Sequence, residues 1–594
     1  MKKLLTGNEA IARGVYEYGT HFAAAYPGTP STEILQNIAQ YKEVIAEWAP
    51  NEKVALESVI GAAYVGGRAF AAMKQVGVNV AADPLFTLSY SGVNGGLILV
   101  SADEPGMHSS QNEQDNRNYA KFAKIPMLEP SDSQEAKSFI KDAYEISEKF
   151  DTPVLYRITT RICHSKGIVE LGEREEVEIK EYEKNVQRRV SVPAFAQKNR
   201  HIVEKRTIAL LEFSNNCDLN YPIYNDKKIG VITSGGVYEY AREVFGGTVS
   251  YLKLGFTNPL PSALISDFAK EVDTLYIIEE NDPYIEDYIK ALGIDCIGKE
   301  KFPYTGELTP DVIRQCVYGK DKQVFEANED MLIKRPPTYC SGCPHRAVFL
   351  ELGKRKDTIV AGDIGCYALG FAPPYNSIDW VVCMGASFST GHGAQKILNL
   401  KKDNKKRLVS VLGDSTFFHT GVNSLLDVVY NKSNTINMIL DNRITGMTGG
   451  QDNPGTGYTA QGELADVVDI EKMVKGCGIK HVKTINPNDK ELLKKTFDWA
   501  YALDEPSVII TQWPCVLKRD YNDEDKSKFG TAFKSQCKVI DEDCIGCKLC
   551  LKTGCPSLGF NKENKKAIIN KNTCVGCEIC LHECPTGAIV KEDK

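Results

Sequence analysis

Residues 407–415 read RLVSVLGDS, and residues 436–442 read INMILDN. Each stretch is a short apolar run, typical of a buried strand, that ends in a polar residue. The runs VVCMGAS at 381–387 and SVIITQW at 507–513 have the same form. Buried strands that alternate with helical patterns predict a parallel sheet, so we expect an α/β domain over residues 335–516.

The two polar strand ends predict a metal site. Asp414 offers a carboxylate and Asn442 an amide oxygen, and the carbonyl of Ile444 offers a third oxygen. Mg²⁺ prefers hard oxygens in octahedral geometry, so these groups suit a magnesium ion that bridges a diphosphate. The MTGGQ turn at 447–451 offers backbone N–H groups to phosphate oxygens. A plain strand–turn–helix connection is the alternative. The predicted cofactor-binding residues are Gly413, Asp414, Ser415, Asn442, Ile444, Gly449 and Gly450.

The first half of the chain predicts two more α/β blocks. Residues 1–170 alternate helical stretches such as GNEAIARGVYEYG with buried runs such as GGLILVSAD. Residues 171–228 are rich in charge, and we expect a linker there. Residues 229–320 open with a strand, a glycine pair and a helix, which predicts a smaller α/β domain.

Cysteines give the most specific motif. The chain has 19, and eight of them lie between Cys544 and Cys584. They form two C-x2-C-x2-C runs, each followed by a Cys-Pro, as in bacterial ferredoxins that hold two [4Fe–4S] clusters. Zinc knuckles and a disulfide knot are the alternatives. The fourth cysteine of such a run ligates the other cluster. We therefore expect one cluster on Cys544, Cys547, Cys550 and Cys584, and the other on Cys574, Cys577, Cys580 and Cys555, within a domain over 537–594.

Composition excludes several classes of protein. Of 594 residues, 42% are hydrophobic and 25% charged, which is ordinary for a globular chain and excludes fibrous or disordered ones. The net charge of −7, without a long basic stripe, argues against nucleic-acid binding as the main role. We read no signal peptide and no apolar run of membrane length, so we expect a cytoplasmic protein with reduced thiols.

These motifs together resemble a known family. GDS at 413–415 followed by LDNRITGMTGGQ at 440–451 resembles the diphosphate-binding domain of 2-oxoacid:ferredoxin oxidoreductases. YPGTPS at 26–31, the helix around Glu57 and DEPGMHSSQNEQDNR at 103–117 resemble their pyrimidine-binding domain. The domain order over nearly the whole length resembles the large α subunits of indolepyruvate:ferredoxin oxidoreductases, in which the small domain is transketolase C-terminal-like.

The resemblance implies a function and residue roles. It implies oxidative decarboxylation of aryl 2-oxoacids, of the indolepyruvate and phenylpyruvate type, to aryl-acetyl-CoA and CO2. Thiamine diphosphate and Mg²⁺ would be cofactors, CoA a co-substrate, ferredoxin the electron acceptor and a smaller β subunit the partner. Glu57 would bind N1′ of the thiamine pyrimidine, and Thr29 would face the substrate. A third cluster is implied on Cys340, Cys343, Cys366 and Cys515, with zinc or core packing as alternatives.

Two other functions stay open. One alternative is an oxidoreductase of the same superfamily for a different 2-oxoacid. The other is an electron-transfer subunit whose thiamine domains are degenerate. Non-oxidative thiamine chemistry releases no electrons, and a ferredoxin-type tail argues against it.

Overall fold

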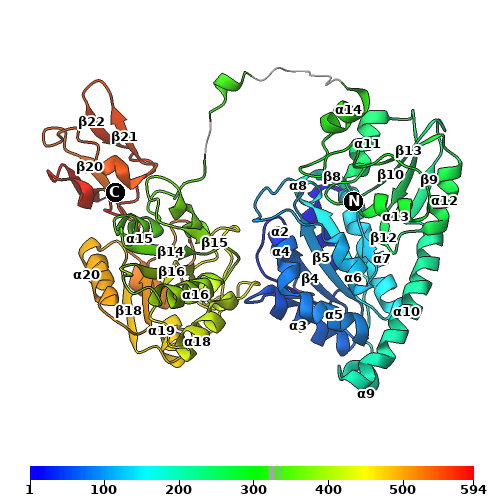
Figure 1. Ribbon diagram of the computed structural model, residues 1–594, viewed down its shortest axis with the longest axis horizontal. Coiled ribbons are helices and arrows are strands. Elements are labelled where there is room, and N and C mark those ends of the chain that lie inside the picture. The colour runs from blue at the N-terminus through cyan, green and yellow to red at the C-terminus, as the bar shows by residue number, and fades with distance from the viewer. Residues whose placement is uncertain (320–327, 334–335, 594) are drawn as a thin grey trace. The chain divides into compact units, whose positions relative to one another are not determined.

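The computed structural model describes residues 1–319, 328–333 and 336–593 (Figure 1). The chain divides into two compact units, Met1–Asn328 and Glu329–Lys594, which are described separately. The predicted domain limits at 320 and 335 lie outside the described residues.

Unit 1 contains a seven-stranded sheet with helices on both faces. The strand order is β12-β6-β7-β5-β4-β2-β3, and only β12 runs antiparallel to its neighbour. The strands are β2 (Phe22–Ala25), β3 (Ile45–Trp48), β4 (Ala69–Lys74), β5 (Leu97–Asp103), β6 (Met127–Leu128), β7 (Val154–Thr159) and β12 (Phe256–Asn258). Central strand β5 is buried along its whole length, as expected for a sheet covered on both sides. The helices of this domain are α1 (Gly7–Glu17), which precedes β2, and α2 (Thr32–Ile38), α3 (Glu52–Tyr64), α4 (Gln75–Val80), α5 (Ala82–Ser91), α6 (Arg117–Ala123), α7 (Ser133–Phe150) and α8 (Thr160–His164).

A smaller four-stranded sheet completes unit 1, in the order β13-β10-β11-β9. Its strands are β9 (Asn220–Ile223), β10 (Ile229–Ser234), β11 (Ser250–Leu254) and β13 (Thr274–Ile277). The helices are α11 (Val237–Phe245), α12 (Ser262–Lys270), α13 (Tyr284–Ala291) and α14 (Pro310–Tyr318). An antiparallel pair, β1 (Lys2–Thr6) with β8 (Lys166–Glu170), closes the first domain. Because β12 follows β11 in the chain yet joins the large sheet, the two α/β blocks are interlocked.

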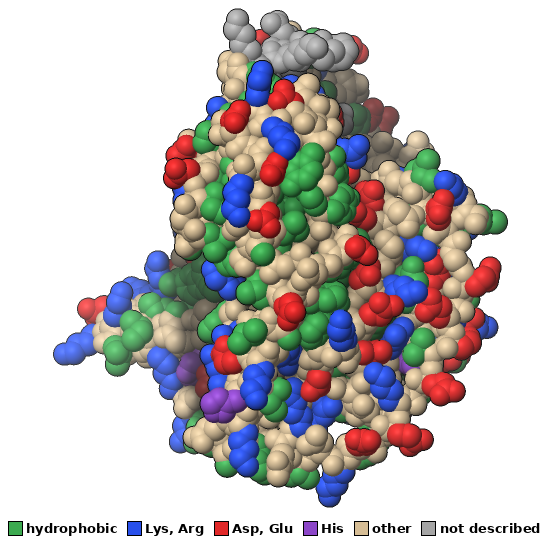
Figure 2. Space-filling view, turned by 90° about the vertical axis from the view of Figure 1, so that its right-hand side faces the viewer, with side chains coloured by type: hydrophobic (Ala, Val, Ile, Leu, Met, Phe, Trp, Pro, Cys, Tyr) green, Lys and Arg blue, Asp and Glu red, His purple; other side chains and the backbone are tan. Residues whose placement is uncertain are grey.

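The prediction of a linker over 171–228 is wrong for most of its second half. This segment contains α9 (Val186–Arg189), the 24-residue α10 (Pro193–Asn216) and edge strand β9. Arg206 of α10 is buried and donates to the carbonyl of Ser89 in α5 at 2.6 Å. Figure 2 views the face on which α10 lies in Figure 1, where charged side chains intersperse with hydrophobic ones. Arg206 thus ties α10 to α5, while most of the charged residues of this segment precede α10, between positions 173 and 189.

Unit 2 contains a six-stranded, all-parallel sheet, as predicted, in the order β15-β14-β16-β17-β19-β18. The strands are β14 (Thr358–Gly362), β15 (Trp380–Val381), β16 (Arg407–Gly413), β17 (Ile436–Asp441), β18 (His481–Ile485) and β19 (Ser507–Gln512). The helices are α15 (His345–Leu352), α16 (Ser387–Asn399), α17 (Asp414–Thr416), α18 (Val422–Tyr430), α19 (Ile470–Gly476), α20 (Lys490–Tyr501) and α21 (Asp523–Phe529). A π-helical turn, Phe417–Gly421, joins α17 to α18. Such turns are rare and are frequent at functional sites.

The cysteine-rich end folds into two antiparallel ribbons. They are β20 (Ser535–Val539) with β23 (Ile589–Asp593), and β21 (Leu558–Asn561) with β22 (Lys566–Ile569). Their small core consists largely of cysteine side chains. None of the helices in the described parts of the chain has both the length and the apolar character needed to cross a bilayer.

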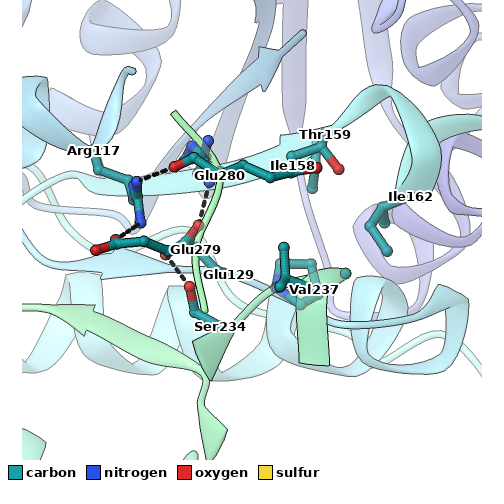
Figure 3. A pocket seen from close by; sticks show the side chains of 13 residues that line it. Arg117, Glu129, Ile158, Thr159, Ile162, Ser234, Val237, Glu279 and Glu280 are labelled. Atoms are coloured by element: carbon teal, nitrogen blue, oxygen red, sulfur yellow. Dashed lines mark hydrogen bonds and ion pairs between the residues drawn. The ribbon is translucent and has the colours of Figure 1, made fainter. Parts of the chain in front are cut away.

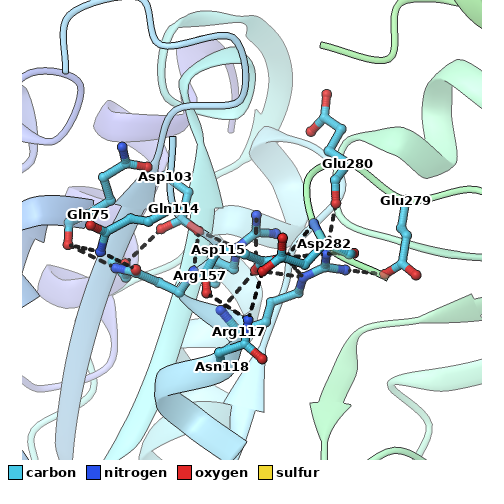
Figure 4. Close-up of polar contacts among 12 residues, drawn as sticks. Gln75, Asp103, Gln114, Asp115, Arg117, Asn118, Arg157, Glu279, Glu280 and Asp282 are labelled. Atoms are coloured by element: carbon cyan, nitrogen blue, oxygen red, sulfur yellow. Dashed lines mark hydrogen bonds and ion pairs between the residues drawn. The ribbon is translucent and has the colours of Figure 1, made fainter. Parts of the chain in front are cut away.

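A buried ion-pair network joins the two sheets of unit 1 (Figure 4). Arg117 is 1% exposed and binds Asp115 from its own segment and Glu279, which follows β13, at 2.6 Å. Arg157 of β7 binds Asp103 at 2.7 Å. The cavity beside this network (Figure 3) is lined mainly by these arginines, by nearby glutamates and by the Ser234–Gly236 turn. We assign it to the contact between the sheets, because most of its charged groups bind one another.

Replacing Arg117 by Met should weaken unit 1, because Asp115 and Glu279 then stay buried without their cation. We expect the free energy of unfolding to fall by about 3–5 kcal/mol. Urea denaturation followed by hydrogen exchange in peptides of unit 1 measures this loss. The control is Arg242→Met, because Arg242 is exposed and its contacts, an ion pair with Glu239 and a place over the Tyr238 ring, lie on its own helix; it should cost less than about 0.5 kcal/mol. Equal stability of the two variants would contradict the assignment.

Candidate functional site

Asp414 and Asn442 come together at one edge of the unit 2 sheet. β16 ends at Gly413 and β17 at Asp441, and these strands are parallel neighbours. Parallel strands present their carboxyl ends at the same edge, which is where α/β sheets bind ligands. Asp414 and Asn442 are both buried there.

Three oxygens converge at this edge. In one orientation of the Asn442 amide, its nitrogen lies 3.5 Å from Nε2 of His345, and its oxygen accepts from the backbone N–H of Ile444 at 3.3 Å. The same oxygen lies 2.7 Å from the carbonyl of Ile444 and 3.2 Å from Oδ1 of Asp414, both of which are acceptors. Neighbouring ligands of octahedral Mg²⁺ are about 3.0 Å apart at a metal–oxygen distance of about 2.1 Å. The donor set therefore fits Mg²⁺, whereas in the opposite orientation the amide nitrogen would donate to both oxygens.

The surroundings of Asp414 suit a cation ligand. Burial and the neighbouring charge of Asp441 raise the pKa of the Asp414 carboxyl to about 7, and a hydrogen bond from Asn453 opposes this rise. Asn453 Nδ2 donates to the second carboxylate oxygen, Oδ2, at 3.1 Å. Next to Asp414, the Ser415 hydroxyl accepts from the hydroxyl of Thr445 at 3.0 Å. A divalent cation would favour the ionised form of this carboxyl.

The glycine turn takes a different form from the expected phosphate cradle. Gly449 and Gly450 both have positive φ, which favours glycine. The N–H of Gly450 donates to the carbonyl of Thr445 at 3.1 Å, and that of Gly449 to Gly446 at 3.4 Å. These two N–H groups therefore close the turn on itself in this conformation.

His345 is a residue of this site that the sequence did not reveal. It begins α15, is 3% exposed and packs edge-on against Tyr367. Burial lowers its pKa to about 4, so the ring is neutral near pH 7. Its position after the Cys340-x2-Cys343 motif was the only available signal.

In unit 1, Thr29 lies in the loop after β2, at the carboxyl edge of the large sheet. Lys74 ends β4 and Glu104 follows β5, so both lie at the same edge. The hydroxyl of Ser109 donates to Glu104 at 2.6 Å and lies 3.5 Å from the carbonyl of Thr29. Lys74 Nζ is 3.4 Å from Glu104, and burial lowers the pKa of Lys74 while Glu104 opposes this. Thr29 is thus half-buried beside a polar group that could face a substrate.

Glu57 lies in a different environment from the one its expected role requires. Its side chain is 45% exposed and pairs with Lys53 on the same helix, as a surface carboxylate does. Glu52, in the first turn of α3, is 6% exposed. A side chain added at Gly77 would lie 2.7 Å from the Glu52 carboxylate, which therefore sits against the start of α4. Because α3 and α4 follow β3 and β4, Glu52 lies at the carboxyl edge of the sheet, and the structure favours it over Glu57.

The first expected set of cluster ligands gathers around one pocket. Cys544, Cys547 and Cys550 line it from the first motif and Cys584 from the second. Burial raises the pKa of Cys550, and the nearby Cys584 and Cys547 add to the rise. The exchange of fourth cysteines between the motifs is therefore present in the fold.

Members of the second set also lie close together. Burial raises the pKa of Cys577, and Cys555 and Cys574 add to this rise. The backbone N–H of Cys537, which is 1% exposed in β20, donates to Sγ of Cys574 at 3.3 Å. Cys537 is thus a further cysteine beside this set.

The cysteines of the possible third cluster come from three segments that meet. Burial together with Cys515 and Cys340 raises the pKa of Cys366 to about 11. Burial raises the pKa of Cys343, and Cys515 and Cys366 contribute. The N–H of Cys515 donates to the carbonyl of Asn442 at 2.9 Å, so this group borders the oxygen site.

The thiol geometry bears on the choice of metal. Within the described ranges, no three His, Cys, Asp or Glu side chains come close enough to bind one metal ion. A single Zn²⁺ needs four ligands at about 2.0–2.3 Å, whereas a [4Fe–4S] cluster spreads its four thiolates over a larger core.

Family profiles match three parts of the chain. The pyruvate flavodoxin/ferredoxin oxidoreductase thiamine diphosphate-binding domain matches residues 13–216, which include α10. The C-terminal thiamine pyrophosphate-binding domain matches 363–511, which include Asp414 and Asn442. A 4Fe-4S binding domain matches 567–590.

Curated relatives match nearly the whole chain. Three proteins, each named indolepyruvate oxidoreductase subunit IorA, come from Archaeoglobus fulgidus, Methanothermobacter marburgensis and Pyrococcus horikoshii. Each is 38% identical to this chain, over 99% of this chain and 97% of the relative. The chain is therefore an oxidoreductase subunit with thiamine diphosphate and [4Fe–4S] domains, and it belongs to the IorA family of indolepyruvate oxidoreductase subunits.

Proposed function

We propose that this chain is the α subunit that oxidises aryl 2-oxoacids, indolepyruvate first among them, to aryl-acetyl-CoA and CO2. A smaller β subunit completes the enzyme, and ferredoxin accepts the electrons. The observation that carries the proposal is the hydrogen bond from Cys515 to Asn442. It supports the proposal because Cys515, one of the four cysteines that would hold an electron acceptor, is a neighbour of Asn442, which would help to hold the cofactor. A non-oxidative thiamine enzyme does not need such an acceptor.

Each residue has a definite task in this proposal. Asp414, Asn442 and Ile444 hold the Mg²⁺ that binds the diphosphate. Bound thiamine diphosphate supplies a carbanion and an electron sink for loss of CO2. Glu52 accepts or donates the hydrogen bond that sets the tautomer of the pyrimidine, and Thr29 faces the substrate.

The reaction balances with two electrons. One 2-oxoacid, one CoA and two oxidised ferredoxins give one acyl-CoA, one CO2, two reduced ferredoxins and one proton. The bond to the carboxylate carbon breaks, and the bond to the CoA sulfur forms. The three cysteine groups of unit 2 hold two [4Fe–4S] clusters in the ferredoxin-type domain and a third next to Asn442, and these pass the electrons singly.

Purified enzyme with its partner subunit tests the proposal directly. Supplied anaerobically with thiamine diphosphate, Mg²⁺ and CoA, it should reduce ferredoxin with indolepyruvate and phenylpyruvate, and much less with pyruvate or 2-oxoglutarate. Reduction that favours 2-oxoglutarate or pyruvate would assign a different 2-oxoacid. No reduction with any acid, despite full iron and bound thiamine diphosphate, would favour an electron-transfer role.

Asp414→Asn should abolish cofactor binding, because it removes the only carboxylate of the oxygen set at nearly constant shape. We expect thiamine diphosphate affinity in the presence of Mg²⁺ to fall at least about 100-fold, as judged by calorimetry. Asp498→Asn is the matched control, since Asp498 lies in α20, is exposed and pairs with Arg355, which follows α15. Stoichiometric, tight binding by the Asp414 variant would refute the metal site.

Glu52→Gln and Glu57→Gln form a matched pair on one helix. The Glu52 variant should bind the cofactor but slow hydrogen–deuterium exchange at C2 of bound thiamine diphosphate by roughly 100-fold or more. The Glu57 variant should exchange as fast as the unmodified chain, because Glu57 is a surface residue in an ion pair. NMR of quenched samples measures both rates, and the opposite pattern would restore the role to Glu57.

A further inference from the structure

Arg346 is a fully buried cation in the middle of unit 2. It lies in the first turn of α15 and is 0% exposed. One terminal nitrogen donates to the Tyr375 hydroxyl at 2.6 Å and to the carbonyl of Thr553 at 2.9 Å. The other donates to the carbonyls of Tyr339 and Cys340, each at 2.8 Å. Every one of these acceptors is uncharged.

No carboxylate in the described part of the chain forms an ion pair with Arg346, and its Nε atom has no hydrogen-bond partner. Arg117 is also buried, but two carboxylates, those of Asp115 and Glu279, balance its charge. A buried charge without a partner is strongly unfavourable. The fold therefore provides a place for negative charge next to Arg346 that the side chains alone do not fill.

Two groups of cysteines surround this position. Arg346 binds the carbonyl of Cys340 on one side, and on the other that of Thr553, two residues before Cys555. Cys340 and Cys555 belong to different groups, one bordering Asn442 and one in the ferredoxin-type domain.

The two groups are in direct contact around Arg346. Gly342 has a φ of +80°, and a side chain there would lie 2.2 Å from the Val575 side chain. The hydroxyls of Ser341 and Ser557 lie 2.6 Å apart. The loop 340–343 thus packs against the loop 575–577, with the guanidinium bound to segments of both groups.

We propose that Arg346 is the shared counter-cation of two [4Fe–4S] clusters, the one on Cys340, Cys343, Cys366 and Cys515 and the one on Cys555, Cys574, Cys577 and Cys580. The inference rests on the proposed function, because it requires the third cluster. A thiolate-ligated cluster carries net negative charge, and nearby charge and hydrogen bonds set its potential. Reduction adds one electron to a cluster and changes no bond at Arg346. Arg346 therefore stabilises the reduced state of both clusters and acts as a positioning residue.

Redox titration followed by EPR tests the inference on the assembled enzyme. Arg346→Met removes the charge but keeps much of the volume, and it should shift the midpoint potentials of two clusters to lower values. The cluster on Cys544, Cys547, Cys550 and Cys584 should keep its potential. The control is Arg407→Met, because Arg407 also binds only carbonyls, those of Asn434 and Leu503, and these lie outside all three cysteine groups. It should shift none of the three.

Iron and sulfide analysis separates this inference from the proposed function. Iron for three clusters with unchanged potentials in Arg346→Met would overturn the inference and leave the proposed function intact. Iron for only two clusters in the unmodified enzyme would overturn the third cluster and the shared role together.

If the Met variant loses its iron, Arg346→Lys tests whether the positive charge at this position is what the clusters require. Lysine keeps the charge with fewer donors, so this variant should retain its iron and keep both potentials close to those of the unmodified enzyme. Loss of iron from the Lys variant to the same extent as from the Met variant would show that charge is not what matters, and would overturn the inference.

Discussion

The contact between the loop at 340–343 and the loop at 575–577 fixes the arrangement of unit 2. Gly342 is closer to Val575 than any side chain would allow, so only glycine fits there. This contact seats the ferredoxin-type ribbons on the thiamine-type domain. Glu583 reinforces it through Lys354 and Lys490, at 3.1 and 3.0 Å. The consequence is that one compact unit holds the oxygen site and all three cysteine groups.

The order of these groups follows from their contacts. The backbone N–H of Cys515 donates a hydrogen bond to the carbonyl of Asn442, which belongs to the oxygen site. Cys340 and Cys555 lie on either side of Arg346, and Cys584 crosses to the outer set. In the proposed function, single electrons pass from the cofactor through neighbouring cysteine groups without leaving the unit. In this account, the fold brings the oxygen site and the three cysteine groups next to one another because an electron passes only between neighbouring groups.

Sequence alone could predict whatever depends on local pattern. Strand ends carry Asp414 and Asn442 because apolar runs stop there, and parallel pairing then brings the two together. Cysteine spacing likewise predicted the set that meets around one pocket. The burial of individual side chains depends on distant segments of the chain, so local sequence patterns did not predict it. Glu52 and Glu57 lie on one helix, about 140° apart around its axis, and the packing of α4 decides which is buried. The sequence around Arg346 is that of an ordinary helix residue, and its burial results from contacts with segments far apart in the chain. The high charge of residues 171–228 likewise led to the prediction of a linker where the structure has the packed helix α10.

The most direct measurement follows electrons into the chain itself. The assembled enzyme, free of ferredoxin and oxygen, is mixed with indolepyruvate and CoA, frozen and examined by EPR. The account predicts signals of reduced [4Fe–4S] clusters that form with the substrate and are absent from the Asp414→Asn enzyme. Release of CO2 while every cluster stays oxidised would contradict it, because the cofactor would then pass no electrons to the cysteine groups of unit 2.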